Sequence, residues 1–279
     1  MIEGRIAALN LYPIKGARGI AIDAARVEVA GLVADGVSDR EWMLVDRDGT
    51  FVTQRELPRL ALVTPAIGAA CLRLDAPGQP RFELSLDPPA GEARDVRVWR
   101  AEVKGFDAGD AAAAWFTSFL GRELRLVRFD RSHLRRCNLD YVGSSGANTL
   151  FADGYPVLVI GEESLADLNA RLAARRSPAL PMNRFRPNLV LSGFEAYGED
   201  HIETLEMGAV ALKLVKPCTR CPVTTTDQES ARVGHEPLTT LASYRRDDRL
   251  AGVIFGMNAI VLRGGTLRVG NTVRASYRF

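Results

Sequence analysis

The feature that most constrains this fold is a series of short segments, apolar or alternating in polarity, that recur along the chain between clusters of glycine, proline and aspartate. Such segments, bounded by turn-forming residues, are typical of β-strands. The turn sequence DRDG joins two of them and predicts a hairpin, and the C-terminal segments resemble the closing hairpin of a barrel. We therefore expect strands at residues 6–12, 25–29, 41–45, 50–54, 69–74, 82–86, 95–104, 122–129, 157–160, 209–215, 259–263 and 266–269.

Helical character is confined to fewer segments. Residues 107–120 combine alanines with aromatic residues at helical spacing, residues 164–172 carry leucines at that spacing, and residues 236–246 begin with a proline at a permitted first-turn position. The chain is therefore expected to be mainly β with a few helices, an α+β protein. Its 279 residues allow one large or two modest domains. We place a boundary so that residues 1–120 and 121–279 form separate domains.

Charge and cysteine content restrict the partners and the compartment. The formal net charge of +2 is too small to suggest binding to nucleic acid, and no apolar run approaches the roughly 20 residues of a membrane span. Four cysteines without a regular framework point to a reducing cytoplasm rather than to a secreted, disulfide-rich fold. The first residues lead directly into a strand, so we expect no signal peptide. These features predict a cytoplasmic protein that contacts neither nucleic acid nor membrane.

The stretch with the most reactive groups is KPCTRCPVTTTDQ at residues 216–228, which contains two thiols, a guanidinium, three hydroxyls and a carboxylate. Cys218 and Cys221 flank Arg220, and a neighbouring cation favours the thiolate, which is the reactive form. The pair therefore suits a soft metal, a redox disulfide or a persulfide. Two unreactive cysteines in a packed turn are the alternative that spacing alone leaves open.

Two common uses of paired cysteines fit this chain poorly. A structural zinc site needs four ligands, whereas Cys71, Cys137 and the histidines are scattered. A thioredoxin-like dithiol should open a helix, but Pro222 and the β-branched run at residues 223–226 follow the pair and favour extended backbone.

Further motifs carry cationic residues beside turns. YPIKG at residues 12–16 places Lys15 next to a glycine that allows close backbone approach, and DREW at residues 39–42 contains Arg40. NRFRPN at residues 183–188 contains Arg186, and the following proline is expected to hold that arginine in extended geometry. Arginine binds phosphate through bidentate hydrogen bonds and stays protonated at physiological pH. A solvated lysine and a surface ion pair of Arg40 are the simpler interpretations of the first two motifs.

In this order the motifs resemble those of MOSC-domain proteins that carry a MOSC N-terminal β-barrel domain, the group of the mitochondrial amidoxime-reducing component and the bacterial reductases of N-hydroxylated bases. The resemblance also covers QRELPRL, FADGYP, EPLTTLASYR and FG further along the chain, and it extends from Tyr12 to Val273. It implies two β-rich lobes, an N-terminal MOSC-associated barrel and a MOSC barrel, with a molybdenum-molybdopterin cofactor between them.

The resemblance also implies roles for individual residues. Cys221 would ligate molybdenum, Cys218 would support it, and Asp227 would orient the cysteine loop or handle a proton. Tyr155 stands where relatives commonly have a small residue. The expected cofactor contacts are Lys15, Gly16, Arg40, Asp153, Gly154, Tyr155, Arg186, Asn188 and Arg220.

The implied activity is reduction of N-hydroxylated compounds (amidoximes, hydroxylamines or N-hydroxylated bases) by an oxidoreductase that uses the molybdenum cofactor. The chain ends without the ferredoxin-like extension of some bacterial relatives, so we expect a separate donor protein of ferredoxin or flavoprotein type. We also expect no N-terminal anchor of the kind that the mitochondrial relatives carry. Two alternatives stay open: a sulfur carrier or cofactor-handling protein that uses a Cys221 persulfide, and a barrel that stores the cofactor without turnover.

Overall fold

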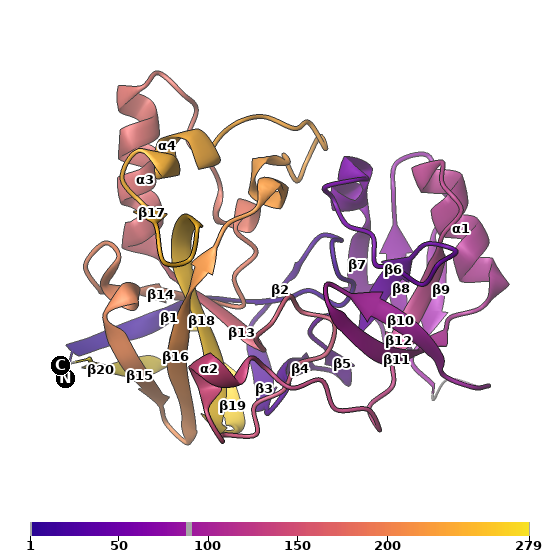
Figure 1. Cartoon of the computed structure of the whole chain (residues 1–279), viewed down its shortest axis with the longest axis horizontal. Coiled ribbons are helices and arrows are strands. Elements are labelled where there is room, and N and C mark those ends of the chain that lie inside the picture. The colour runs from indigo at the N-terminus through magenta and orange to yellow at the C-terminus, as the bar shows by residue number, and fades with distance from the viewer. Residues whose placement is uncertain (1, 88–90, 279) are drawn as a thin grey trace.

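A closed barrel of seven strands forms the larger of two lobes in the computed structural model, which describes residues 2–87 and 91–278 (Figure 1). The last strand of the series returns to pair with the first, so within the described residues the barrel has no free edge. In order around the barrel the strands are β13 (Val157–Gly161), β14 (Leu189–Ser192), β1 (Ile2–Leu11), β20 (Thr272–Tyr277), β15 (Ile202–Met207), β16 (Val210–Thr219) and β18 (Gly252–Arg263).

The first strand of the chain belongs to this barrel. β1 pairs antiparallel with β14 on one side and with β20 on the other, so both termini lie together (Figure 1). Short strands extend the sheet at β2 (Ile20–Ile22) and β17 (Arg246–Asp247). A separate four-stranded sheet packs below the barrel and consists of β19 (Gly265–Arg268), β3 (Ala24–Glu28), β4 (Gly31–Ala34) and β5 (Val37–Ser38).

The smaller lobe contains two further sheets and one helix. The four-stranded sheet consists of β10 (Arg94–Val98), β11 (Ala101–Asp107), β12 (Arg125–Phe129) and β6 (Trp42–Val45). The three-stranded sheet consists of β7 (Thr64–Ile67), β8 (Cys71–Asp75) and β9 (Phe82–Ser85). Helix α1 (Asp110–Leu120) buries its aromatic face against them and ends at Gly121, whose left-handed φ of 69° stops the helix.

The remaining helices lie on or beside the barrel. α3 (Glu162–Ala174) packs its leucines toward β13 and β14, and α2 (Leu139–Val142) and α4 (Leu238–Ala242) are short. The 3₁₀ turns are η1 (Pro58–Leu62), η2 (Met182–Arg184), η3 (Gly198–Asp200) and η4 (Pro222–Thr225). Across the described residues, no helix combines the length and the apolar character needed to cross a membrane.

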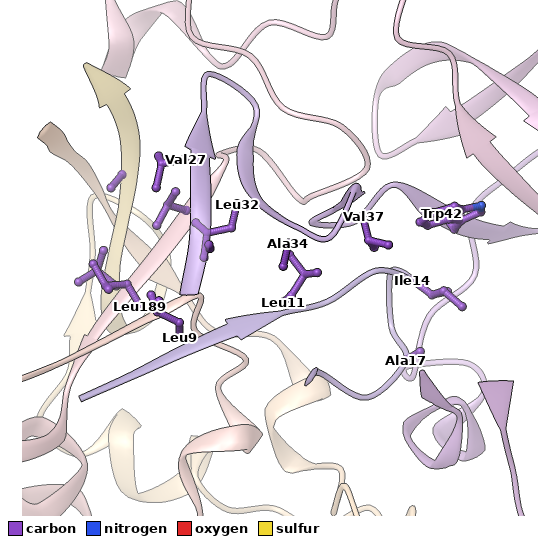
Figure 2. Packing of buried hydrophobic residues seen from close by; sticks show 14 of the residues in the cluster. Leu9, Leu11, Ile14, Ala17, Val27, Leu32, Ala34, Val37, Trp42 and Leu189 are labelled. Atoms are coloured by element: carbon purple, nitrogen blue, oxygen red, sulfur yellow. The ribbon is translucent and has the colours of Figure 1, made fainter. Parts of the chain in front are cut away.

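One hydrophobic core runs through both lobes. Figure 2 shows it following β1 from Leu9, beside Leu189 in the barrel, to Ile14 and Trp42 at the entrance of the smaller lobe. These side chains are at most 1% exposed. Because the apolar contact is continuous across the junction, the two lobes are held together and a site between them has fixed walls.

The predicted fold class, mainly β with a few helices in a two-lobed arrangement, is confirmed. Three local predictions are wrong. Residues 50–54 form no strand, because only Thr50 and Phe51 make isolated bridges, to Arg97 and Val45. Residues 95–104 form two strands, because the chain reverses at Trp99 and Arg100 and Val98 pairs with Ala101. The C-terminal strands do not form a hairpin, since β18 pairs with β13 and β16, β19 pairs with β3, and β20 pairs with β1 and β15. The division at residue 120 stays a prediction.

Replacing Gly256 by alanine is expected to destabilise the barrel where β18 crosses β13. Gly256 has a φ of 77°, and an added Cβ would lie 2.8 Å from the carbonyl oxygen of Val159. Gly208 is a matched control because its φ is 62° and its Cβ would meet open space. We expect losses of about 1 kcal/mol for Gly208→Ala and about 3 kcal/mol for Gly256→Ala in urea unfolding. Equal losses would contradict the close approach.

Candidate functional site

A cleft between the lobes gathers the residues nominated from the sequence. Its cavity volume is about 130 Å³, below the roughly 300–1,000 Å³ typical of small-molecule and cofactor sites. Every nominated residue except Asp227 lines it. The lining residues are Lys15, Gly16, Arg40, Thr53, Arg55, Ala152, Asp153, Gly154, Tyr155, Leu158, Phe185, Arg186, Asn188, Cys218, Thr219, Arg220, Cys221, Val223, Thr224 and Asn258.

The thiol loop begins where β16 ends. Cys221 directly precedes the 3₁₀ turn η4, and both cysteines of the motif are half-buried free thiols at the cleft. The prediction of extended backbone over residues 223–226 is wrong for residues 223–225, which form η4, whereas Thr226 is extended. The hydroxyls of Thr224 and Thr225 donate to the carbonyls three residues before them, over 3.0 and 2.8 Å, and Pro222 is pre-set for the first position of the turn. The turn presents Cys221 to the cleft.

Arg220 ties this loop to the rest of the barrel. Its Nη2 donates to the carbonyl of Phe185 over 2.6 Å, and its Nη1 lies 2.9 Å from the sulfur of Cys218. Its Nε is buried without a hydrogen-bond partner among the described residues. Such an orphaned donor is uncommon in folded proteins. The guanidinium is therefore only partly satisfied by the protein.

Two guanidinium groups stack on the ring of Tyr12. Arg40 and Arg186 stack on it with their Cζ atoms 4.3 and 4.4 Å from the ring centre. Burial raises the pKa of Tyr12 to about 12, although the nearby arginines oppose this change. The ring stays neutral at physiological pH. Its electron-rich faces hold the two cations in place.

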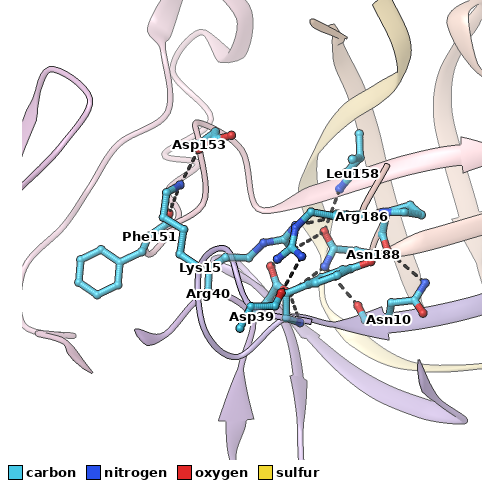
Figure 3. A network of polar contacts seen from close by, with 12 residues as sticks. Asn10, Lys15, Asp39, Arg40, Phe151, Asp153, Leu158, Arg186 and Asn188 are labelled. Carbon is cyan, nitrogen blue, oxygen red and sulfur yellow. Dashed lines mark hydrogen bonds and ion pairs between the residues drawn. The ribbon is translucent and has the colours of Figure 1, made fainter. Parts of the chain in front are cut away.

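Arg40 and Asn188 are fixed by a buried network (Figure 3). Arg40 forms an ion pair with Asp39, which is 3% exposed. The amide of Asn188 donates to Asp39 over 2.9 Å, and its oxygen accepts from Arg40 over 3.1 Å and from the backbone of Leu158 over 3.1 Å. Burial raises the pKa of Asp39 despite the adjacent guanidinium. The network fixes the position of Arg40.

Arg186 has no carboxylate partner among the described residues. Its Nη1 donates to the carbonyl of Ala17 over 2.6 Å. Burial, followed by repulsion from Arg40, lowers the pKa of Arg186 to about 10. Its backbone φ is 57°, so the prediction that Pro187 holds it in extended geometry is wrong. The residue instead occupies the strained left-handed region.

Lys15 reaches the cleft from the turn after β1. Its Nζ donates to the carbonyl of Phe151 over 2.8 Å and to Asp153 over 2.5 Å (Figure 3). Burial lowers the pKa of Lys15, and the carboxylate of Asp153 partly opposes this. Desolvation acts to raise the pKa of Asp153, but attraction to Lys15 and Arg40 and hydrogen bonds from Lys15 and Trp99 together outweigh it, so the pKa is lowered.

Asp153→Asn is expected to lower the unfolding free energy by about 1 kcal/mol at pH 7, because Lys15 keeps its buried charge while its exposed partner loses its own. A carboxylate with a lowered folded-state pKa stabilises the protein above its ordinary pKa near 4, and this stability is lost as pH falls through the folded-state value. The difference in urea midpoint between wild type and Asp153→Asn should therefore be the same from about pH 5 to 8. It should begin to shrink below about pH 4.

Asp95→Asn is the matched control for that measurement. Asp95 pairs with Lys104 over 2.7 Å on the surface, where both side chains are exposed. Removing such a pair should change the unfolding free energy by less than about 0.5 kcal/mol. If Asp153→Asn unfolded with the same free energy as wild type, the ion pair with Asp153 would not stabilise the buried Lys15.

The remaining nominated residues differ in what they contribute. The hydroxyl of Tyr155 is buried and has no hydrogen-bond partner among the residues that the structure describes, and burial raises its pKa. Gly16 and Gly154 bring backbone to the cleft wall. Asp227 lies behind the thiol loop, where it accepts from Ser230 and pairs with Arg184 over 3.2 Å. These are the contacts of a turn-capping carboxylate, and a catalytic role for Asp227 stays a prediction.

Several residues of the site escaped nomination from the sequence, among them Tyr12, Asp39 and Arg55. Tyr12 and Asp39 stand inside the motifs YPIKG and DREW, and Arg55 stands inside QRELPRL. The signal available was their adjacency to Lys15, Arg40 and Gln54 in those motifs. Adjacency in the sequence could not predict that Tyr12 stacks on arginines or that Asp39 is buried, because both features depend on contacts with residues 186–188.

Both halves of the chain match described families. The MOSC N-terminal beta barrel domain matches residues 3–123, and the MOSC domain matches residues 147–274. Mitochondrial amidoxime reducing component 2 of Rattus norvegicus is 37% identical over 283 residues, which cover 97% of this chain and 82% of that protein. The Bos taurus component 2 is 36% identical and the Homo sapiens component 1 is 35% identical, each with the same coverage.

Proposed function

The chain belongs to the family of MOSC-domain proteins with a MOSC N-terminal beta barrel domain, and from that premise we propose that it is an oxidoreductase that uses a molybdenum-molybdopterin cofactor to reduce N-hydroxylated compounds. The names of the relatives support amidoximes as substrates. Hydroxylamines and N-hydroxylated bases share the same N–O bond. The alternative of a sulfur carrier or cofactor-handling protein depends on the same thiol.

The charge of the cleft fits an anionic cofactor. Within the described residues, Arg186 and Arg220 have no carboxylate partner, and Arg220 keeps a buried Nε without an acceptor. Uncompensated buried charge is unfavourable unless an opposite charge arrives. Phosphate and dithiolene groups carry such charge, and guanidinium forks match phosphate geometry. Arg40 and Lys15 already pair with Asp39 and Asp153. They would therefore help to position the cofactor more than to neutralise its charge.

Cys221 is the donor that suits molybdenum. Thiolate is a soft ligand, and η4 presents Cys221 at the cleft wall. No three His, Cys, Asp or Glu side chains in the described part of the chain form a group that could hold a metal alone. A metal bound here would therefore share one protein thiolate with ligands that the cofactor brings. When bound, molybdenum would supply the two-electron chemistry.

The protein's own residues would bind and orient. Arg186 and Arg220 would neutralise the negative charge of the cofactor. Tyr12 would hold the guanidinium groups of Arg40 and Arg186 in position by stacking. Asp227 would hold the thiol loop through Arg184, whose Nη1 donates to Thr224 over 3.3 Å. The overall reaction consumes two electrons and two protons per N–O bond and yields the N–H compound and water. We assign the electrons to a separate ferredoxin- or flavoprotein-type donor, and the four free cysteines favour a reducing cytoplasm.

One observation carries the proposal: a half-buried thiol and two guanidinium groups without carboxylate partners line the same cleft. The test is metal and pterin analysis of the purified protein, together with benzamidoxime reduction by an artificial electron donor. We expect molybdenum and pterin in equal amounts and turnover to benzamidine. Metal-free protein with cyanolysable sulfur would favour the sulfur carrier. Bound cofactor without turnover would favour storage.

A further inference from the structure

A solvent-exposed tryptophan stands at the mouth of the cleft in an unfavourable backbone conformation. Trp99 is 44% exposed and is the first of two residues in the turn between β10 and β11, with a φ of 57°. Tight hairpin turns of this kind place glycine, asparagine or aspartate at a positive φ. A bulky residue there is a strained outlier, and strain of this kind clusters at functional sites.

The indole ring is nevertheless held in one orientation. Its Nε1 donates to Asp153 over 3.0 Å, which links it to the carboxylate that already pairs with Lys15. The ring of Phe51 packs beside it with a centroid distance of 5.0 Å. These contacts fix an aromatic surface at the rim of the cleft. An exposed aromatic ring fixed in this way is a stacking platform for a planar ligand.

Arg55 covers part of this surface and faces the cleft. Its Cζ lies 4.3 Å from the ring centre of Trp99 and 5.7 Å from that of Phe51. Its guanidinium makes no hydrogen bond and no ion pair with any described residue, and it lines the cleft. Arg128 also stacks on a tryptophan, Trp42, but pairs with Glu41 over 2.7 Å. The charge of Arg55 is therefore left for a ligand.

We propose that Arg55 and Trp99 form a substrate-selecting wall, which favours planar aromatic N-hydroxy compounds that carry an anionic substituent such as a carboxylate. The guanidinium of Arg55 would bind the carboxylate through two parallel hydrogen bonds. Its stacking on the indole ring fixes the plane of the guanidinium group. The substrate ring would pack beside Trp99, and its N-hydroxy end would extend along the cleft that Cys221 also lines. The inference rests on the proposed function and adds a substrate class to it.

The kinetic test compares benzamidoxime with 4-carboxybenzamidoxime. We expect wild-type kcat/KM to favour the carboxylated compound by about tenfold, mainly through KM, since one charge-assisted contact contributes roughly that factor. Arg55→Met should bring the ratio close to one. Arg59→Met is the matched control, because Arg59 stacks on Phe119 at 4.5 Å and does not line the cleft. It should keep the wild-type ratio.

A binding test avoids the cofactor. 4-Carboxybenzamidine and benzamidine cannot be reduced, and their binding can be followed by tryptophan fluorescence because the other two tryptophans, Trp42 and Trp115, are buried. We expect quenching by the carboxylated compound in wild type, weaker binding in Arg55→Met, and no quenching in Trp99→Gly. Glycine suits the positive φ, so the last variant should fold at least as well as wild type.

The outcomes separate this inference from the proposed function. A wild-type ratio near one, or a ratio that Arg55→Met leaves intact, overturns the substrate wall. Loss of pterin or molybdenum in Arg55→Met also overturns it, because Arg55 would then hold the cofactor. If the protein carries no molybdenum and reduces neither compound but still binds the carboxylated amidine through Arg55 and Trp99, the wall stands and the proposed function fails.

Discussion

Cys221→Ser is expected to lower benzamidoxime reduction by at least about 100-fold and to remove most of the molybdenum from the purified protein. Altering residues that merely support a metal ligand lowers metal affinity or activity by roughly 10- to 100-fold, and removing the ligand itself should exceed that. Serine keeps the size of the side chain but replaces a soft thiolate with a hydroxyl that is protonated at neutral pH. The fold should be unchanged because Cys221 is half-buried at the cleft wall.

The two matched controls are other cysteines of the same chain. Cys218→Ser alters a thiol that also lines the cleft and contacts Arg220, and it should retain at least half of the metal. Cys71→Ser alters a half-buried thiol of β8 outside the cleft and should be wild-type in metal and rate. Metal content is measured by mass spectrometry and pterin by the fluorescence of its oxidised form. A Cys221→Ser protein with full metal and full rate would show that the ligand is wrong.

The site was largely predictable because its residues are concentrated in short motifs. Each motif combines a turn with a residue of obvious chemistry, such as Lys15 beside a glycine or Cys221 beside an arginine. Turn chemistry is local, so the sequence indicates that such residues sit on loops even when their partners are unknown. The order of the motifs, matched to a family, then predicted that the loops meet at one cleft. Their lining of that cleft agrees with this expectation.

Features decided by distant contacts were not predictable from the same patterns. β1 closes the barrel by pairing with β20, some 270 residues away, and the alternation of β1 does not encode that partner. The same limit applies to the C-terminal strands, which were expected to pair with each other and instead pair with distant strands. Strand periodicity specifies which face is buried but leaves the neighbour open.

Local rules failed where side chains or tertiary contacts override propensity. Val223 and the threonines after it favour strand by propensity, yet the hydroxyls of Thr224 and Thr225 donate to the carbonyls three residues before them within η4. Arg186 precedes a proline and was expected to be extended, but it is stacked on Tyr12 and adopts a left-handed φ of 57°. Trp99 reverses the chain where glycine is usual. All three exceptions lie at the cleft or its rim, where strain is found in functional sites.

Arg186→Met is expected to stabilise the cofactor-free protein while removing most of the bound cofactor. The lowering of the pKa of Arg186 from 12.5 to about 10 corresponds to roughly 3 kcal/mol of unfavourable burial of charge. The variant loses the bond to Ala17 and the stacking on Tyr12, together about 2 kcal/mol, so a net gain of about 1 kcal/mol should remain. Because the folded-state pKa is the lower one, the penalty is complete below pH 10 and fades as pH rises toward 12.5.

The measurement uses protein produced in cells that cannot make molybdopterin, unfolded in urea, beside holoprotein assayed for pterin. Arg184→Met is the control for stability, because Arg184 is a buried arginine whose charge is paired with Asp227. Breaking that pair should destabilise the protein by at least about 1 kcal/mol, so the two arginine variants should shift the urea midpoint in opposite directions. If Arg186→Met were destabilised and still retained its pterin, the guanidinium would serve the fold. An arginine that binds an anionic cofactor instead leaves its buried charge uncompensated, and so destabilises the protein, until the cofactor binds.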